Sequence, residues 1–210
     1  MPIVTVSGHS RKVGKTSIVE GLISALPEYR WTALKVSSHR HPVNCENYEN
    51  TEKDCIVVEE TCGKGGNDAS RFIKAGAVRA FWIQAERIEA AAPAIRSIIK
   101  DATYVVIEGN GVLDCVTADF SILVVNCGVE EFKKSARDIL ARADALVLID
   151  AGAGLPEWKN LLESIPKNIP RFETGDPGVF PPALKKLLSD NFYLKVTSRP
   201  DADGIDRKGG

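Results

Sequence analysis

The first 27 residues place the strongest constraint on how this chain can fold. Residues 3–6 (IVTV) are a β-branched run that predicts a buried strand. A loop of glycine, small and basic residues follows at 8–16 (GHSRKVGKT), and residues 17–26 carry apolar side chains at helical spacing until Pro27. A strand, a loop ending in Gly-Lys-Thr and a helix, in that order, are the context of a phosphate-binding loop.

The residue types in this loop fit a nucleoside triphosphate with Mg²⁺. Backbone N–H groups of a tight loop and of a helix start form a concave anion site. We expect Lys15 to reach the β- and γ-phosphates, Thr16 to bind Mg²⁺, and Gly14 to let the backbone approach the phosphates. The residues predicted to contact the nucleotide in this segment are Gly8, Ser10, Arg11, Lys12, Val13, Gly14, Lys15, Thr16 and Ser17.

The spacing of the loop departs from the usual one by a residue. His9 stands where the first glycine is expected, and the glycine is Gly8. This longer spacing resembles dethiobiotin synthetase and its relatives among the signal-recognition, MinD and BioD-type NTPases. Ser10 occupies the place of the signature lysine of MinD-type proteins, which argues against that subgroup. Arg11 and Lys12 are either simply exposed or add positive charge at a nucleotide-dependent dimer interface. The alternative for the whole segment is an ordinary glycine turn with a solvated lysine.

Length and charge narrow the class of protein. The 210 residues suit one α/β domain, expected over residues 1–197, with residues 198–210 as a polar, flexible tail. The 27 basic and 28 acidic residues give a net charge of −1, which disfavours nucleic acid as a partner. The sequence contains neither a stretch of membrane-spanning length nor a leader, so we expect no membrane association and a cytoplasmic location.

Apolar strands alternate with helical patterns along the chain. Helices are predicted at 67–75, 85–100, 131–142, 156–164 and 182–190, and Pro93 predicts a kink or a break. Strands are predicted at 31–37, 79–84, 104–107, 120–126 and 145–149, with an edge strand at 170–173. The polar segment 43–66 shows little periodicity beyond a short strand at 56–58. This order predicts a three-layer, doubly wound α/β fold with a mostly parallel sheet.

In such a sheet the ligand lies at the carboxyl ends of the strands, where Glu108 ends the strand 104–107. An NTPase needs an acid near its metal ion, and Glu108 is the best placed. The segment VVIEGNG (105–111) resembles the V-x-x-E-G-x-G strand end of dethiobiotin synthetase, whose glutamate serves at the metal. The alternative is a surface acid without a role in chemistry.

Lys35 and Asp68 are the other two candidates for chemistry. As a plain helix N-cap, Asp68 needs no further function, and Asn67 would cap equally well. The segment DASRFIKAGA (68–77) resembles the D-[ST]-x-R-x-x-x-A-G-A stretch of the molybdopterin-guanine dinucleotide biosynthesis protein B family, with Ala69 in place of the hydroxyl residue. Lys35 matches the lysine of that family's I-K-H and of the K-P motif of dethiobiotin synthetase. These resemblances imply catalytic or phosphate roles for both residues, and make Asp68 a second candidate metal ligand.

Five residues around the second strand form a possible transition-metal site. His39 and His41 flank Arg40, and Cys45, Cys55 and Cys62 follow in the same polar region. The spacings match no common zinc pattern, so reduced bystander thiols and a solvated basic loop are the alternatives.

The base of the nucleotide is not determined by the sequence. GTP-binding relatives use N-K-x-D after a late strand, whereas here the strand 145–149 ends in Asp150-Ala-Gly. Asp150 either contacts a base or ribose or caps the following helix. Both ATP and GTP therefore remain open.

The resemblance to the protein B family implies a slow, Mg²⁺-dependent NTPase that assists molybdenum cofactor biosynthesis as a homodimer with a partner protein. An ATP-dependent small-molecule ligase or kinase of dethiobiotin synthetase type is the first alternative. A nucleotide-gated metallochaperone is the second.

Overall fold

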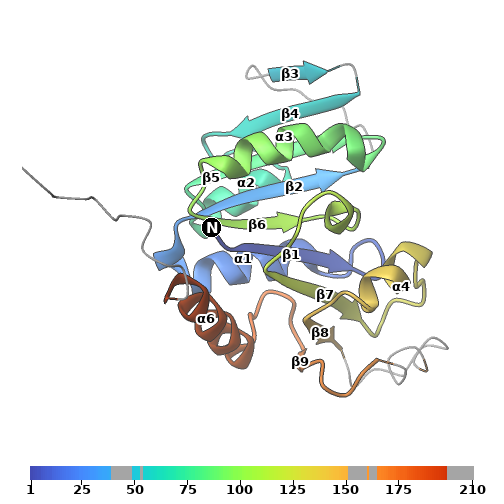
Figure 1. Ribbon diagram of the computed structural model, residues 1–210. Coiled ribbons are helices and arrows are strands. Elements are labelled where there is room, and N and C mark those ends of the chain that lie inside the picture. Colours follow the sequence, from blue (N-terminus) through green and yellow to red (C-terminus); the bar gives the residue numbers. More distant parts are fainter. Residues whose placement is uncertain (39–48, 53, 151–159, 161–164, 198–210) are drawn as a thin grey trace, which may run out of the picture.

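The computed structural model describes residues 1–38, 49–52, 54–150, 160 and 165–197. The described strands form one nine-stranded sheet in the order β3-β4-β5-β2-β6-β1-β7-β8-β9 (Figure 1). The seven strands from β5 to β9 run parallel, and β4 is antiparallel to both β5 and β3. Their bounds in chain order are Ile3–Gly8 (β1), Trp31–Ser37 (β2), Glu49–Glu52 (β3), Cys55–Glu60 (β4), Arg79–Ala85 (β5), Tyr104–Glu108 (β6), Phe120–Asn126 (β7), Ala145–Ile149 (β8) and Arg171–Thr174 (β9). The predicted α/β class with a mostly parallel sheet is confirmed.

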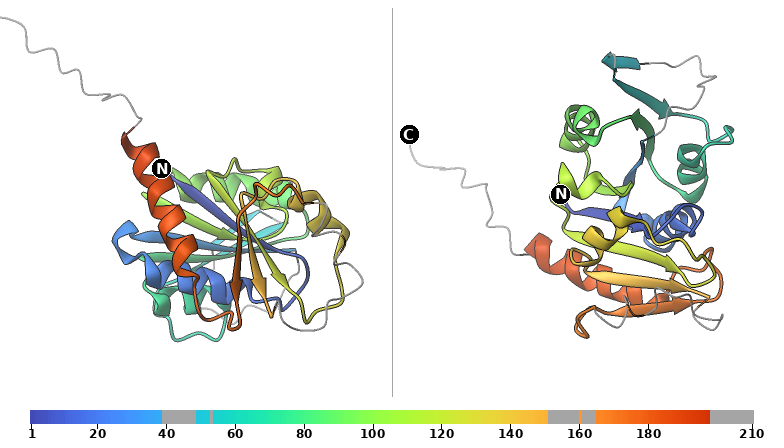
Figure 2. Two further views of the ribbon diagram at one scale, coloured as in Figure 1. Left: turned by 90° about the horizontal axis from the view of Figure 1, so that it is seen from below. Right: turned by 90° about the vertical axis from the view of Figure 1, so that its right-hand side faces the viewer.

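Helices cover both faces of this sheet, as the edge-on view of Figure 2 shows. The helices α1 (Lys15–Ala25), α2 (Asp68–Ala75) and α6 (Pro182–Thr197) pack on one face. The helices α3 (Ile88–Lys100) and α4 (Lys134–Leu140) pack on the other. Two short 3₁₀ helices, η1 (Pro27–Tyr29) and η2 (Val112–Asp114), follow α1 and β6. The three-layer arrangement follows because the central strands β1, β6, β7 and β8 are buried on both faces.

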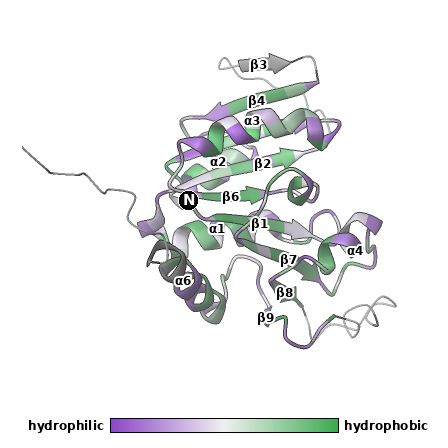
Figure 3. Ribbon diagram, viewed as in Figure 1, coloured by the Kyte–Doolittle hydropathy of each residue, from purple (hydrophilic) through white to green (hydrophobic). Residues whose placement is uncertain are grey.

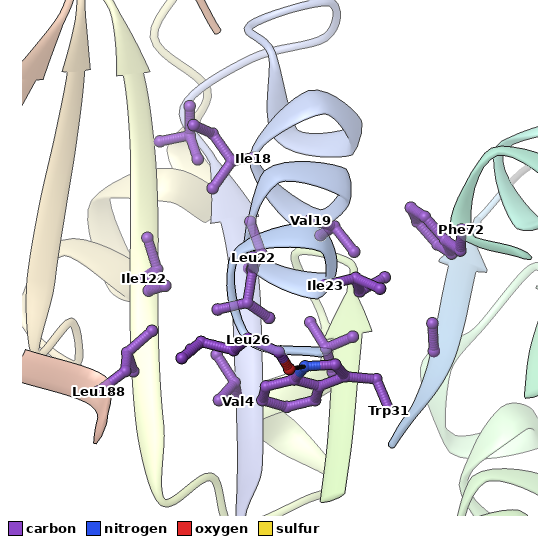
Figure 4. Close-up of a cluster of buried hydrophobic side chains, with 14 of the residues drawn as sticks. Val4, Ile18, Val19, Leu22, Ile23, Leu26, Trp31, Phe72, Ile122 and Leu188 are labelled. Atoms are coloured by element: carbon purple, nitrogen blue, oxygen red, sulfur yellow. Dashed lines mark hydrogen bonds between the residues drawn. The ribbon is translucent and has the colours of Figure 1, made fainter. Parts of the chain in front are cut away.

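The largest apolar cluster lies between α1 and the sheet (Figure 4). Leu22 and Ile23 of α1 are fully buried there, together with Trp31 of β2 and Leu188 of α6. The Trp31 indole N–H donates to the carbonyl of Leu26 over 2.8 Å, so its one polar atom is satisfied inside the core. Each fully buried aliphatic side chain of this kind stabilises the fold by roughly 1.5–3 kcal/mol. Figure 3 shows the same division, with hydrophobic central strands and hydrophilic residues on the outer helices.

The segment 43–66 is more regular than its composition predicts. The short strand expected at 56–58 is the full strand β4, Cys55–Glu60, and it pairs antiparallel with β5. A further strand, β3, continues the sheet beyond it. The sequence signal was weak because an edge hairpin needs only one apolar face, and turn and charged residues dilute its alternation.

Helix ends and Pro93 also differ from expectation. The helix expected at 131–142 is limited to Lys134–Leu140, while the last helix extends from Pro182 to Thr197 rather than to 190. The helix α3 is one element through Pro93, not two pieces. Pro93 is exposed, and its missing N–H removes only one helical hydrogen bond, while Ala91, Ala92 and Ile95 hold the helix on the sheet. The helix predicted at 156–164 and the tail 198–210 lie outside the described residues.

The strand β1 lies between β6 and β7, where the order of connections reverses along the sheet. Crossovers that leave in opposite directions open a crevice at the carboxyl end of such a strand. The loop 8–14 begins there, directly beside the end of β6. Among the described residues, no helix is both long and apolar enough to cross a bilayer.

Candidate functional site

The loop between β1 and α1 is tightly folded and depends on two glycines. Lys12 and Gly14 have positive φ angles of 55° and 95°. A Cβ on Gly14 would lie 2.8 Å from the side chains of Ile149 and Pro177. Both the positive φ and this steric clash therefore favour glycine over any other residue at position 14. At Gly8 a Cβ would lie 2.7 Å from the Val13 side chain. The loop therefore closes on itself around Gly8, which explains why the glycine is found one residue earlier than usual.

Asn110, in the turn after β6, clamps the first residue of the loop. Its Oδ1 accepts from the Gly8 N–H over 3.0 Å, and its Nδ2 donates to the Gly8 carbonyl over 2.8 Å. The Gly109 N–H donates to the Val6 carbonyl over 3.1 Å and holds the same turn. The two hydrogen bonds from the Asn110 side chain fix the point where the chain leaves the sheet, and so they set the direction of the loop.

The segment after β7 holds the other side of the loop. His9 is fully buried; its backbone N–H donates to Val124, and its Nε2 lies 3.3 Å from the Val129 carbonyl. Burial lowers the pKa of His9, which favours a neutral ring. The Ser10 hydroxyl donates to the Glu131 carboxylate, and the Lys133 N–H donates to the His9 carbonyl over 3.0 Å. His9 thus replaces a glycine with a packed side chain that anchors the loop.

Lys15 begins α1 and folds back over the loop. Its Nζ donates to the Ser10 carbonyl over 2.8 Å. The side chain is half-buried, because the loop wraps its aliphatic stem. Burial lowers the pKa of Lys15, and the nearby Lys35 and Lys133 lower it further while Glu108 opposes them.

Glu108 ends β6 with its side chain only 1% exposed. Its Oε2 accepts from the Thr16 hydroxyl over 2.9 Å, and its Oε1 accepts from the Lys35 ammonium over 2.5 Å. Lys35 and Glu108 are register partners on the neighbouring strands β2 and β6, so strand alternation turns both side chains to the face that α1 and α2 cover. A buried acid without such partners would be strongly destabilising.

Asp68 completes this group from the first turn of α2. Its Oδ2 lies 2.7 Å from the Lys35 ammonium. Asn67 is the N-cap, accepting from the Ser70 N–H over 2.8 Å, so Asp68 is free of capping and faces the site. Burial works against the charge of Lys35, but the carboxylates of Glu108 and Asp68 outweigh it and raise the pKa of Lys35. We call Thr16, Lys35, Asp68 and Glu108 the carboxylate cluster.

The carboxylate cluster has the ligands that Mg²⁺ prefers. Two carboxylates and a hydroxyl, from Asp68, Glu108 and Thr16, converge beside the phosphate-binding loop. Hard divalent ions take oxygen ligands of this kind and bind with one or two carboxylates plus substrate phosphates. The residues present therefore fit a magnesium ion carried by a nucleotide.

The other predicted contacts divide into buried and exposed residues. Val13 is buried, Arg11 and Lys12 are exposed at the tip of the loop, and the Ser17 hydroxyl accepts from Arg71 over 3.3 Å. Asp150 is exposed at the end of β8 with a φ of 54°, and its N–H donates to the Thr174 carbonyl over 3.3 Å. A role of Asp150 at the base stays a prediction.

The possible transition-metal site is not assembled in the part of the chain that the structure describes. His39, His41 and Cys45 lie outside it. Cys55 is buried in β4, and Cys62 is exposed beside Glu60. Within the described ranges, no three His, Cys, Asp or Glu side chains are grouped to hold a metal ion.

Sequence reasoning missed three parts of the site. Asn110 stands in the Glu-Gly-Asn-Gly turn that was already singled out, so its polarity between two glycines was an available signal. Glu131 meets Ser10, and the Val129 carbonyl meets the His9 ring, only through the fold. Arg71 packs across α1 and α2, with both oxygens of Glu20 within 2.9 Å of its guanidinium.

No family model and no curated protein matches the chain. Among solved structures, the chain resembles HypB from Helicobacter pylori in complex with nickel, with a TM-score of 0.51 and 15% identity over 92% of this chain and 86% of HypB. It also resembles a zinc-bound triple mutant of the E. coli GTPase YjiA, with a TM-score of 0.52 and 14% identity over 88% of this chain. The chain spans 61% of that YjiA chain.

At these identities the likeness shows the fold. Together with the strand order and the loop between β1 and α1, it defines an α/β protein with the P-loop NTPase fold.

Proposed function

We propose that the chain is a Mg²⁺-dependent nucleoside triphosphate hydrolase. The observation that carries the proposal is the junction of the phosphate-binding loop and the carboxylate cluster through Thr16. This residue lies one position after Lys15 and donates to Glu108 over 2.9 Å. One side chain therefore links the phosphate end of the site to its acids, as metal-assisted phosphoryl transfer requires.

The chemistry divides among the residues of the site. The loop N–H groups and Lys15 would bind the β- and γ-phosphates, since the Lys15 ammonium lies against the loop, 2.8 Å from the Ser10 carbonyl. Thr16, Glu108 and Asp68 would hold Mg²⁺, which when bound neutralises charge that develops on the phosphates. Before the metal binds, Lys35 would hold Glu108 and Asp68 in position.

Residues 68–77 resemble a segment of the molybdopterin-guanine dinucleotide biosynthesis protein B family, and this resemblance adds a biological role to the proposal. The Asp68 that opens this segment belongs to the carboxylate cluster. On that basis the protein would act as a slow NTPase, as a homodimer with a partner protein, in molybdenum cofactor biosynthesis, in the cytoplasm. Turnover that rises when the partner is added would distinguish this role.

A small-molecule ligase or kinase is the second candidate, and the position of Lys35 favours it. The Lys35 ammonium lies beside the metal acids, where it would meet an acceptor carboxylate or phosphate next to the γ-phosphate. The metallochaperone alternative has less support, since neither Cys55 nor Cys62 belongs to a group of three or more possible ligands among the described residues.

Calorimetric titration with non-hydrolysable ATP and GTP analogues, each with and without Mg²⁺, tests the proposal. We expect one analogue to bind tightly, and Mg²⁺ to strengthen its binding. A GTP preference would support the cofactor-assembly role, and an ATP preference would favour the ligase or kinase. If neither analogue binds, the proposed function is wrong.

A further inference from the structure

The Lys35 ammonium lies between the two acids that the proposed function assigns to the metal. It is 2.5 Å from Glu108 Oε1 and 2.7 Å from Asp68 Oδ2. The second oxygen of Glu108 is engaged by the Thr16 hydroxyl, which is the third expected metal ligand. One positive charge of the protein itself therefore bridges the oxygens that a divalent ion would use.

The ammonium and a metal ion cannot share this position. Mg²⁺ requires its oxygen ligands at about 2.0–2.1 Å in a near-octahedral arrangement. The side chain of Glu108 is 1% exposed and that of Lys35 is 17% exposed, so water screens the repulsion between two cations there only weakly. A metal ion that binds both acids must first displace Lys35.

We propose that Lys35 is an internal cation that competes with divalent metal for Asp68 and Glu108. The metal then enters together with the nucleotide, because the phosphates supply both further oxygen ligands and a new anionic partner for the displaced ammonium. The flexible four-carbon stem of lysine permits this movement. This inference rests on the proposed function, and it adds a regulation of the same site: metal alone binds weakly.

Mn²⁺ binding without nucleotide tests this directly, measured by the loss of the free-ion electron paramagnetic resonance signal. Lys35→Gln should bind Mn²⁺ at least about tenfold more tightly than the wild type, since the competing charge is gone. The matched control is Arg71→Gln. Its guanidinium lies 3.8 Å from Asp68 Oδ1 but does not bridge the two acids. This control should change Mn²⁺ affinity by less than about threefold.

Two results would overturn the inference. The first is that Lys35→Gln gains no more affinity than Arg71→Gln, because removal of a nearby charge would then explain the whole effect. The second is that the gain in Mn²⁺ affinity persists in the double variant that combines Lys35→Gln with Glu108→Gln, because the ion would then bind elsewhere.

A measurement on the wild type covers the case in which Lys35→Gln fails to fold. The Lys35 amine is labelled with an acylating reagent and quantified by mass spectrometry, with exposed Lys64 as the internal reference. Saturating Mn²⁺ should raise labelling of Lys35 several-fold relative to Lys64, and unchanged labelling contradicts the competition. Nucleotide affinity is measured separately by calorimetry and tests the proposed function. A failure of nucleotide binding can therefore be distinguished from a failure of the competition between Lys35 and metal.

Discussion

The phosphate-binding loop and the carboxylate cluster lie side by side, yet they are held in place by different interactions. The loop 8–14 is fixed by glycine geometry and mainly by hydrogen bonds between uncharged groups, above all the pair between Asn110 and Gly8. Charged groups add two bonds at Ser10, to Glu131 and from Lys15. The carboxylate cluster is fixed mainly by ion pairs among side chains from β2, α2 and β6, together with the hydrogen bond from Thr16 of α1.

This difference separates binding from turnover. The uncharged bonds between Asn110 and Gly8 hold the start of the loop whether or not charge is present, which suits a preformed anion site. Ion pairs can be exchanged for other charged partners, which suits a site where metal and phosphate arrive and leave. Substitutions in the loop should therefore weaken nucleotide binding first, and those in the cluster should reduce turnover first.

Lys15→Ala should have the largest effect. We expect nucleotide affinity to fall by about 1,000-fold, because Lys15 would make charge-assisted hydrogen bonds to two phosphates. Calorimetric titration measures the affinity, and circular dichroism checks that the fold is intact. Lys64→Ala, which removes an exposed lysine outside the site, is the control. Unchanged affinity in Lys15→Ala would refute nucleotide binding at this loop.

Glu108→Gln should separate the two regions. We expect kcat to fall by about 100-fold, since the neutral amide cannot hold the metal that stabilises the transferring phosphate. Nucleotide affinity measured without Mg²⁺ should change by less than about fivefold, because the loop donors are intact. A steady-state hydrolysis assay beside calorimetry gives both numbers. Normal hydrolysis would move the metal acid elsewhere, with Asp68 the next candidate.

Asn110→Ala should lower nucleotide affinity more than kcat, the opposite of Glu108→Gln. Loss of both hydrogen bonds from the Asn110 side chain leaves the Gly8 N–H and carbonyl unpaired, which costs about 1–3 kcal/mol of stability. We expect nucleotide affinity to fall about tenfold with a smaller change in kcat. Asn110→Asp keeps the acceptor but loses the donor and adds a negative charge beside the phosphates, so it should bind nucleotide more weakly than Asn110→Ala. The reverse order would mean that Asn110 does not aim the loop.

The smallest effect should come from pH acting on His9. Burial lowers the folded-state pKa of His9 below its unfolded value of about 6.5. As the pH falls, the unfolded chain therefore binds the proton first. The stabilisation is complete above about pH 6.5 and declines below it, by at most about 1.4 kcal/mol per pH unit.

Urea unfolding of the wild type and of His9→Gln at pH 7.5 and 5.5 measures this effect. The variant should lose less stability between the two pH values, and the comparison cancels His39 and His41, which both proteins share. An equal loss in both proteins would show that His9 is not the group that titrates.

The sequence by itself determined the phosphate-binding loop and the α/β class. Gly8, Gly14, Lys15 and Thr16 act within nine consecutive residues, so their chemistry can be inferred from spacing and backbone conformation alone. The buried strands could be predicted for a similar reason, since short apolar runs between helical patterns are typical of buried strands.

Only the tertiary structure decided which polar side chains meet. Asn110 reaches Gly8 across 102 positions, and Lys35 reaches Glu108 across 73. The register of β2 on β6 brings Lys35 and Glu108 together. The cap at Asn67 releases Asp68 to join them, although sequence alone allowed either residue to be the cap. Local pattern sets the backbone and the face of each residue, but ion pairs between distant residues depend on strand order and register, which neighbouring residues do not encode.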